Sequence, residues 1–151
     1  MRLLFMVVII SFAFCVGAFA QTASSDSIDA EKKRFLEILR KQIAGKEEQP
    51  APEVFKNITF MNRTPAGRLL NVMELGFSRS LGVSCTHCHV PGEWEKDEKP
   101  QKRIAREMSN MVGTINRELL PKIKNLQTEV PVVNCTTCHR GQIKPALNLS
   151  K

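Results

Sequence analysis

Two short motifs in this chain place cysteine and histidine in the same pattern. Residues 85–89 read Cys-Thr-His-Cys-His and residues 135–139 read Cys-Thr-Thr-Cys-His. A Cys-x-x-Cys-His motif is the attachment site of a c-type haem, because each thiol adds to one vinyl group of the porphyrin and the histidine binds the iron. We therefore predict two covalently bound haem c groups. The predicted attachment residues are Cys85, Cys88, Cys135 and Cys138, and the predicted iron ligands are His89 and His139.

Two other uses of these cysteines would make the histidines coincidental. A zinc ion could take four thiolates, two from each motif, or each pair could form a disulfide. Neither arrangement needs a histidine. The chain has only 3 histidines, and two of them directly follow a Cys-x-x-Cys pair. The pattern therefore favours haem, and with it redox chemistry.

The scarcity of histidine also restricts the sixth ligand of each iron. The remaining histidine, His87, lies inside the first motif, where its backbone position keeps it from the distal face of its own haem. At least one haem therefore lacks a second histidine ligand, and we expect that neither has one. Methionine, lysine or an open position remains, and methionine is the usual partner, which raises the reduction potential. Beyond residue 20 the methionines are Met61, Met73, Met108 and Met111.

Position along the chain reduces the number of these methionines that are candidate sixth ligands. Met73 precedes Cys85 by 12 residues, on a predicted helix that leads into the first motif, and we expect it to bind the first iron. Met108 and Met111 lie on the helix ahead of the second motif, three residues apart and on nearly the same face. Periodicity alone does not separate these two. The alternative use of each methionine is to fill the apolar core.

The segments that precede the motifs are predicted to be helical. Apolar residues recur at helical spacing over 24–45, from Thr64 to a turn at Gly76 or Gly82, and over 101–120. No segment has a convincing strand pattern. We therefore predict a mainly α fold: a small multihaem c-type cytochrome with two helix–turn–CxxCH repeats and an N-terminal helix.

Local signals predict the helix starts and the connections. Asp26 or Ser27 can cap the first helix, and Thr64 can cap the second with Pro65 at its first helical position. Linkers or irregular segments are expected at 46–52, at 53–61 and at 91–100, which holds Trp94.

The first 20 residues have the features of an export signal. Arg2 is followed by an apolar run over 3–14 and by Ala-Phe-Ala at 18–20, so we predict cleavage before Gln21. The apolar stretch is close to the lower limit for a membrane span, which leaves an uncleaved anchor as the alternative. Cleavage removes Cys15, so that every remaining cysteine belongs to a haem motif.

Export agrees with haem attachment, which takes place outside the cytoplasmic membrane in bacteria, and we expect a periplasmic protein. The predicted organisation is a signal peptide at 1–20, an N-terminal helix and linker at 21–52, and a dihaem cytochrome c domain at 53–151. The chain carries a formal charge of +7, with its basic residues dispersed and no aromatic residues interleaved. Nucleic-acid binding is therefore not expected. The basic residues form a solvated surface or, alternatively, a docking surface for an acidic redox partner.

Residues 81–91, 105–116 and 133–141 together resemble the tetrahaem cytochrome subunit of photosynthetic reaction centres, a family that also includes small dihaem proteins. The resemblance covers about 55–145 and corresponds to half of that subunit, with one pair of haems. In that family a helix alongside the haem supplies a methionine to iron. The family pattern Met-x-x-x-Ile-Asn falls on Met111, Ile115 and Asn116, so the resemblance selects Met111 as the second sixth ligand.

The resemblance implies electron transfer through two low-spin His/Met haems and not catalysis. Redox partner proteins would dock transiently, because electron-transfer encounters use small interfaces. The main alternatives are a bound subunit of a larger respiratory or photosynthetic complex, with association at a membrane, and a small dihaem peroxidase with one open iron position. A sensor module is a further alternative, but no signalling domain is recognisable.

Overall fold

The computed structural model describes residues 25–145, 147 and 148. The predicted signal peptide and Cys15 lie outside these residues. Within them the chain is helical, as predicted, and its only β-pairing consists of two isolated bridges, Pro50 with Pro65 and Val90 with Glu93. No helix in this part of the chain is both long enough and apolar enough to span a membrane.

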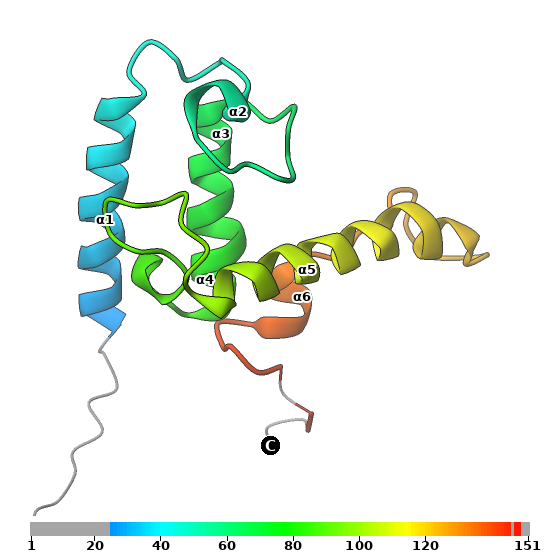
Figure 1. Ribbon diagram of the computed structural model, residues 1–151. Coiled ribbons are helices and arrows are strands. Elements are labelled where there is room, and N and C mark those ends of the chain that lie inside the picture. Colours follow the sequence, from blue (N-terminus) through cyan, green and yellow to red (C-terminus); the bar gives the residue numbers. More distant parts are fainter. Residues whose placement is uncertain (1–24, 146, 149–151) are drawn as a thin grey trace, which may run out of the picture.

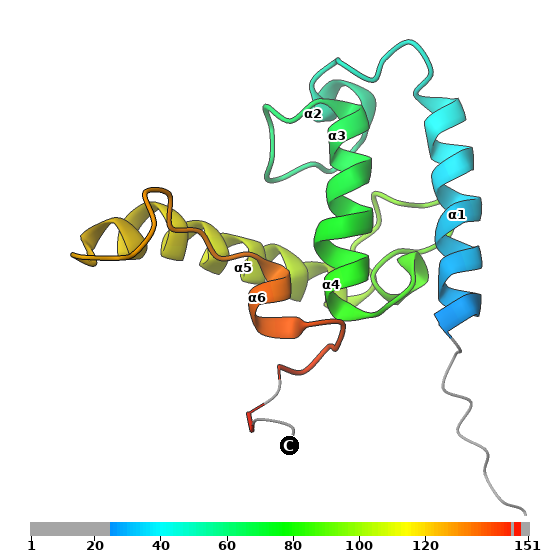
Figure 2. The same cartoon turned by 180° about the vertical axis from the view of Figure 1, so that it is seen from behind.

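The N-terminal helix α1 (Ser25–Gln42) packs on the helix that leads to the first motif, and the two stand side by side in Figures 1 and 2. Leu36 and Leu39 of α1 share a buried cluster with Ala66 and Leu70 of α3 (Ala66–Asn71). The predicted cap of α1 is wrong: the helix begins at Ser25, so Asp26 and Ser27 lie in its first turn.

One continuous helical rod leads into the first motif. It comprises α3, the π-helix η1 (Val72–Ser78) and α4 (Arg79–Leu81). The predicted cap is one residue too early, because Pro65 is the N-cap of α3 and no side chain caps it. Gly76 lies within η1, and the turn is made at Gly82, whose φ of 65° is in the left-handed region that favours glycine.

A short helix, α2 (Ala51–Val54), lies in the segments expected to be a linker or irregular. The backbone ties it to the start of α3, since the Ala51 amide donates to the Thr64 carbonyl at 2.8 Å and the Ala66 amide donates to the Gln49 carbonyl at 2.9 Å. These two bonds hold the segment against the start of α3, at one end of the α1–α3 pair.

The third predicted helix is present and forms an arm that projects from the other helices (Figures 1 and 2). It consists of α5 (Pro100–Thr114), the π-helix η3 (Ile115–Leu119) and the 3₁₀-helix η4 (Leu120–Lys122). The loop after it returns along the arm to α6 (Cys135–His139), which contains the second motif.

Helix α6 packs against α4 and against the turn at Gly82 that follows it. The hydroxyls of Ser80 and Thr136 are 2.6 Å apart, and the Gly141 amide donates to the Ser80 carbonyl at 2.8 Å. A Cβ at Gly82 would lie 2.1 Å from the Gly141 carbonyl oxygen, so no larger residue fits there. The second motif is thus fixed directly to the turn that precedes the first.

Candidate haem-binding sites

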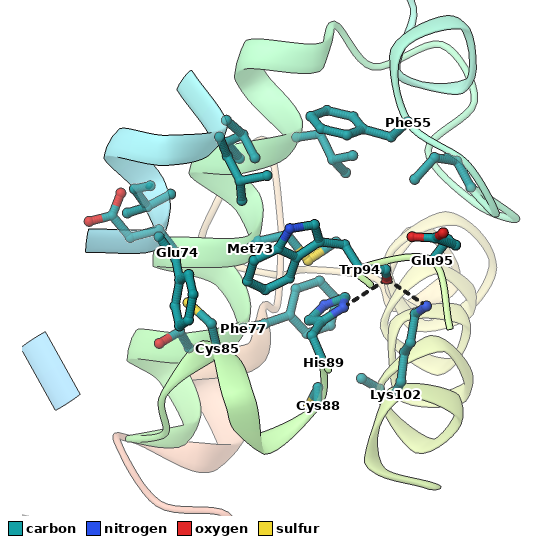
Figure 3. A pocket seen from close by; sticks show the side chains of 18 of the residues that line it. Phe55, Met73, Glu74, Phe77, Cys85, Cys88, His89, Trp94, Glu95 and Lys102 are labelled. Carbon is teal, nitrogen blue, oxygen red and sulfur yellow. Dashed lines mark hydrogen bonds between the residues drawn. The ribbon is translucent and has the colours of Figure 1, made fainter. Parts of the chain in front are cut away.

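The first motif opens on an apolar cavity of about 320 Å³. The 3₁₀-helix η2 (Cys85–His87) supplies Cys85, and Cys88 and His89 follow it, while Met73 reaches the same cavity from η1 (Figure 3). Two thiols, an imidazole and a thioether therefore converge on one space, which is the donor set that a His/Met haem c requires. Its apolar lining includes Phe35, Leu36, Phe55, Phe60, Leu70 and Phe77.

The imidazole of His89 is held in one orientation. Its Nδ1 lies 3.0 Å from the Trp94 carbonyl oxygen, and the two rings are 5.7 Å apart between centroids. The Trp94 ring is fixed in turn by an edge-on contact with Phe35 at 5.0 Å. Since Nδ1 is bonded to the carbonyl, Nε2 is left for a metal. Burial lowers the pKa of His89, which favours the neutral imidazole that binds metals.

Met73 lies in a π-helical segment, half-buried at the cavity wall. A π-helix widens the turn and is often found at functional sites. Met73 and His89 come from different elements and reach the same cavity, as the predicted ligand pair requires.

Helix α1 and the loop at 91–99 support the first motif through contacts that the sequence does not reveal. The Glu31 carboxylate accepts hydrogen bonds from the backbone amide and the hydroxyl of Thr86, at 3.1 and 2.9 Å. Lys99 donates to the Thr86 carbonyl. Lys102 of α5 is buried and donates to the Trp94 carbonyl at 2.9 Å. Glu31 and Lys102 have ordinary helical positions in the sequence, so no local signal indicates these roles.

The second motif lies in a more open setting. Asn134 and Thr137 form a capping box that starts α6. The Nδ1 atom of His139 lies 3.1 Å from the Gln142 carbonyl oxygen, so its Nε2 is left for a metal in the same way as that of His89. Cys138 is exposed, and Cys135 and His139 are half-buried. The apolar cavity of the first motif includes neither these residues nor Met111, which is 46% exposed on α5.

The two motifs share an anchoring arrangement with the helix ahead of them. The Val83 amide donates to the Ser78 carbonyl at 3.1 Å, and the Ser78 hydroxyl donates to the Val83 carbonyl. In the second copy the Asn116 side-chain amide bonds both the amide and the carbonyl of Val133, each at 2.8 Å. Each valine stands two residues before the first cysteine of its motif.

This shared register also distinguishes the methionines. Met73 stands five residues before the anchor Ser78, and Met111 stands five residues before the anchor Asn116. Five residues after Met108 the chain has Gly113, which has no side chain to bond. Met111 therefore occupies the place in the second copy that Met73 occupies in the first, and Met108 does not.

The arrangement does not bring the four motif cysteines together as a four-cysteine zinc site would require. The four cysteines of the motifs are free thiols, and no group of three or more histidine, cysteine or acidic residues gathers within metal-binding reach in the described part of the chain. A four-cysteine zinc site would need all four sulfurs together. Burial raises the pKa of Cys85, Cys88 and Cys135 above that of a free thiol.

Comparison with known proteins gives one consistent set of relatives. The family described as photosynthetic reaction centre cytochrome C subunit matches residues 16–149. Cytochrome c-554 of Chloroflexus aurantiacus is 32% identical over 85 residues, which cover 56% of this chain and 20% of the relative. The photosynthetic reaction centre cytochrome c subunit of Thermochromatium tepidum is 29% identical over 96 residues (63% and 22%), and that of Rubrivivax gelatinosus is 35% identical over 84 residues (48% and 23%). The chain spans about a fifth of the length of these curated relatives.

Proposed function

The chain belongs to the family of photosynthetic reaction centre cytochrome c subunits, and from this we propose that it is a periplasmic electron-transfer protein with two haem c groups. Family membership supports an electron-transfer cytochrome with covalently bound haem. The proposal goes beyond what family membership supports in three respects: the haem count, the iron ligands and the compartment.

The proposed roles follow the two copies of the site. Cys85 and Cys88 attach the first haem, and Cys135 and Cys138 attach the second. When bound, the haems supply one-electron chemistry, with iron alternating between the ferric and ferrous states. The proposed iron ligands are His89 with Met73 in the first site and His139 with Met111 in the second.

One observation carries the proposal: the same local geometry is built twice by different elements. In both copies a backbone carbonyl holds Nδ1 of the histidine, and in both the helix ahead of the motif is bonded to the valine two residues before the first cysteine. Met73 and Met111 have the same register relative to those anchors. A chance similarity of two cysteine motifs would not reproduce all three features.

The residues around the first site suit electron transfer better than catalysis. If His89 and Met73 both held the iron, no position would be left open to a substrate such as peroxide. Most of the cavity lining is apolar, and an apolar surrounding keeps the change in solvation on electron transfer small. We therefore propose a carrier and not an enzyme. Redox partner proteins dock transiently, and no nucleic acid is involved.

A bound subunit of a larger complex is the second candidate. Two of the relatives are named as subunits of a photosynthetic reaction centre, and this favours association with a membrane complex.

The division of the chain into a signal peptide at 1–20, an N-terminal helix and linker at 21–52 and a dihaem domain at 53–151 remains part of the proposal. Helix α1 lines the cavity of the first site through Phe35, Leu36 and Leu39, so the N-terminal segment packs against the proposed dihaem domain.

The test is the intact mass and the visible spectrum of the exported protein, expressed with the haem-attachment machinery. The expected mass is that of residues 21–151 plus two haems, with a low-spin spectrum in both oxidation states. A double Cys135→Ala and Cys138→Ala variant should lose the mass of one haem and keep the other. A single haem in the parent protein, or a high-spin ferric spectrum, would contradict the proposal.

A further inference from the structure

Lys102 places a buried positive charge in the wall of the first site. The residue is only 8% exposed, and its ammonium group has three acceptors for its three protons. These are the Trp94 carbonyl at 2.9 Å, the Lys96 carbonyl at 2.8 Å and the Asp97 carboxylate at 3.0 Å. A buried cation is costly unless it is paired and hydrogen-bonded, so Lys102 is held in place by a complete set of partners.

The Trp94 carbonyl is shared between Lys102 and His89. It accepts from Lys102 Nζ at 2.9 Å and lies 3.0 Å from His89 Nδ1, and Figure 3 shows both contacts meeting at this one oxygen. A carbonyl has two lone pairs and can accept both. An ammonium group draws electron density from that oxygen, so it becomes a weaker acceptor for the His89 N–H. A weaker acceptor leaves the imidazole less basic toward a metal.

The charge of Lys102 is only partly neutralised. Among the described residues Asp97 is its one anionic partner, and Arg106 bonds the same carboxylate at 3.0 Å. The pKa of Asp97 lies far below its usual range, because hydrogen bonds from Arg106, Asn57 and Lys102 stabilise the charged form. Two cations thus share one carboxylate, so these three side chains together carry a net positive charge beside His89, in a cavity wall that also holds the carboxylates of Glu74 and Glu95.

The second site is built without this feature. The Gln142 carbonyl lies 3.1 Å from His139 Nδ1, and among the described residues no lysine or arginine donates to that carbonyl. The second motif is also more exposed than the first, so nearby charges act there through a higher dielectric.

We propose that Lys102 raises the reduction potential of the haem held by Cys85 and Cys88 above that of the second haem, so that electrons move from the second haem to the first. This inference rests on the proposed dihaem function. Reduction lowers the positive charge at iron, and a nearby cation favours the reduced state. A less basic histidine ligand stabilises the ferric state less, which shifts the potential in the same direction.

The test is a spectroelectrochemical titration of the full dihaem protein carrying Lys102→Gln. Mutation of a group that hydrogen-bonds a metal ligand typically changes metal affinity or activity by about 10–100-fold, and Lys102 acts one hydrogen bond further out, through the Trp94 carbonyl. We expect the equilibrium constant for reduction of the first haem to fall about tenfold, which is about 59 mV for a one-electron couple. The conservative variant Lys102→Arg keeps the positive charge and should retain most of the reduction potential of the first haem. Arg103→Gln removes the same charge from a neighbouring side chain that is 73% exposed, and should leave both potentials nearly unchanged.

Asp97→Asn separates an electrostatic role from a structural one. It breaks the same ion pair as Lys102→Gln but removes a negative charge, so the potential of the first haem should rise. A loosened loop would shift the potential in the same direction in both variants. If Lys102→Gln fails to bind haem, the direction of the potential shift in Asp97→Asn still tests the electrostatic role.

A further variant shows which redox transition in the titration belongs to which haem. Met111→His replaces a proposed sixth ligand and should lower the reduction potential of the second haem alone. The inference is overturned if Lys102→Gln leaves the first potential unchanged, if Arg103→Gln shifts it equally, or if Asp97→Asn lowers it. Failure of the proposed function would look different, because the parent protein would then lack two low-spin haems before any variant is compared.

Discussion

The bond between Asn116 and Val133 is expected to anchor the second haem motif, and Asn116→Ala removes it. The side chain makes two hydrogen bonds to the Val133 backbone, both at 2.8 Å, and both residues are half-buried. A typical hydrogen bond contributes about 0.5–1.5 kcal/mol to stability. Two such bonds give about 1–3 kcal/mol, and we expect about 1–2 kcal/mol because water can replace part of the loss at a half-exposed site.

Urea unfolding of the haem-loaded protein measures this loss. With a slope of about 2 kcal/mol/M, the midpoint should fall by about 0.5–1 M. Asn110→Ala is the matched control, since Asn110 is exposed on the same helical arm and the two variants make the same change. The spectrum of the second haem should also change in Asn116→Ala, while that of the first stays constant. Equal midpoints for the two variants would refute the proposed anchor.

Three further predictions test the ligands, the turn and the ion pairs. Met111→Ala should change the low-spin spectrum of one haem, whereas Met108→Ala should leave both haems low-spin; visible spectra of the ferric proteins distinguish them. Gly82→Ala should destabilise the fold by at least about 1–3 kcal/mol in urea unfolding, because its φ is 65° and its Cβ would lie 2.1 Å from a carbonyl oxygen. Gly45→Ala, with a φ of 78° but no atom within 4 Å, should cost less. The lowered pKa of Asp97 stabilises the folded state above the ordinary aspartate pKa of about 3.9, and this contribution is lost as the pH falls toward the lowered value. Stability measured between pH 6 and about pH 2 should therefore fall less in Asp97→Asn than in the parent; parallel curves would count against the ion pairs.

The helices could be predicted because each has an apolar stripe at helical spacing, and burial of that stripe is what stabilises it. Their caps could not. Thr64 has the right residue type for an N-cap, but the chain at Pro65 is still extended, with ψ of 146°, and the helix starts after it. The backbone pairing of the segment around Ala51 with Thr64 and Ala66 determines that start, and no local pattern records such a pairing.

The repeated anchor was hidden from sequence reasoning by unequal spacing. Ser78 and Val83 are 5 residues apart, whereas Asn116 and Val133 are 17 apart. The extra residues in the second copy form the end of the arm and the loop that returns from it. The two anchors also use different chemistry, a hydroxyl in one and an amide in the other, so only the folded chain brings out their equivalence.

The residues that bind the cofactor were accessible to sequence reasoning because covalent attachment requires a fixed local motif. The residues that support the site from outside the motif could not be predicted from the sequence. Glu31 reaches Thr86 from 55 positions away, and Lys102 meets the Trp94 carbonyl through the packing of α5 on a loop. Such contacts depend on tertiary packing, and an ordinary glutamate or lysine in a helix gives no sign of them.

Iron X-ray absorption spectroscopy of the purified dihaem protein tests the ligand assignment most directly, because it gives the average number of sulfur atoms bound per iron. With Met73 and Met111 both bound, it should find one sulfur and five nitrogens per iron in both oxidation states. Met73→Ala and Met111→Ala should each reduce the average to half a sulfur per iron. An average of half a sulfur or none in the parent protein would contradict a pair of His/Met haems.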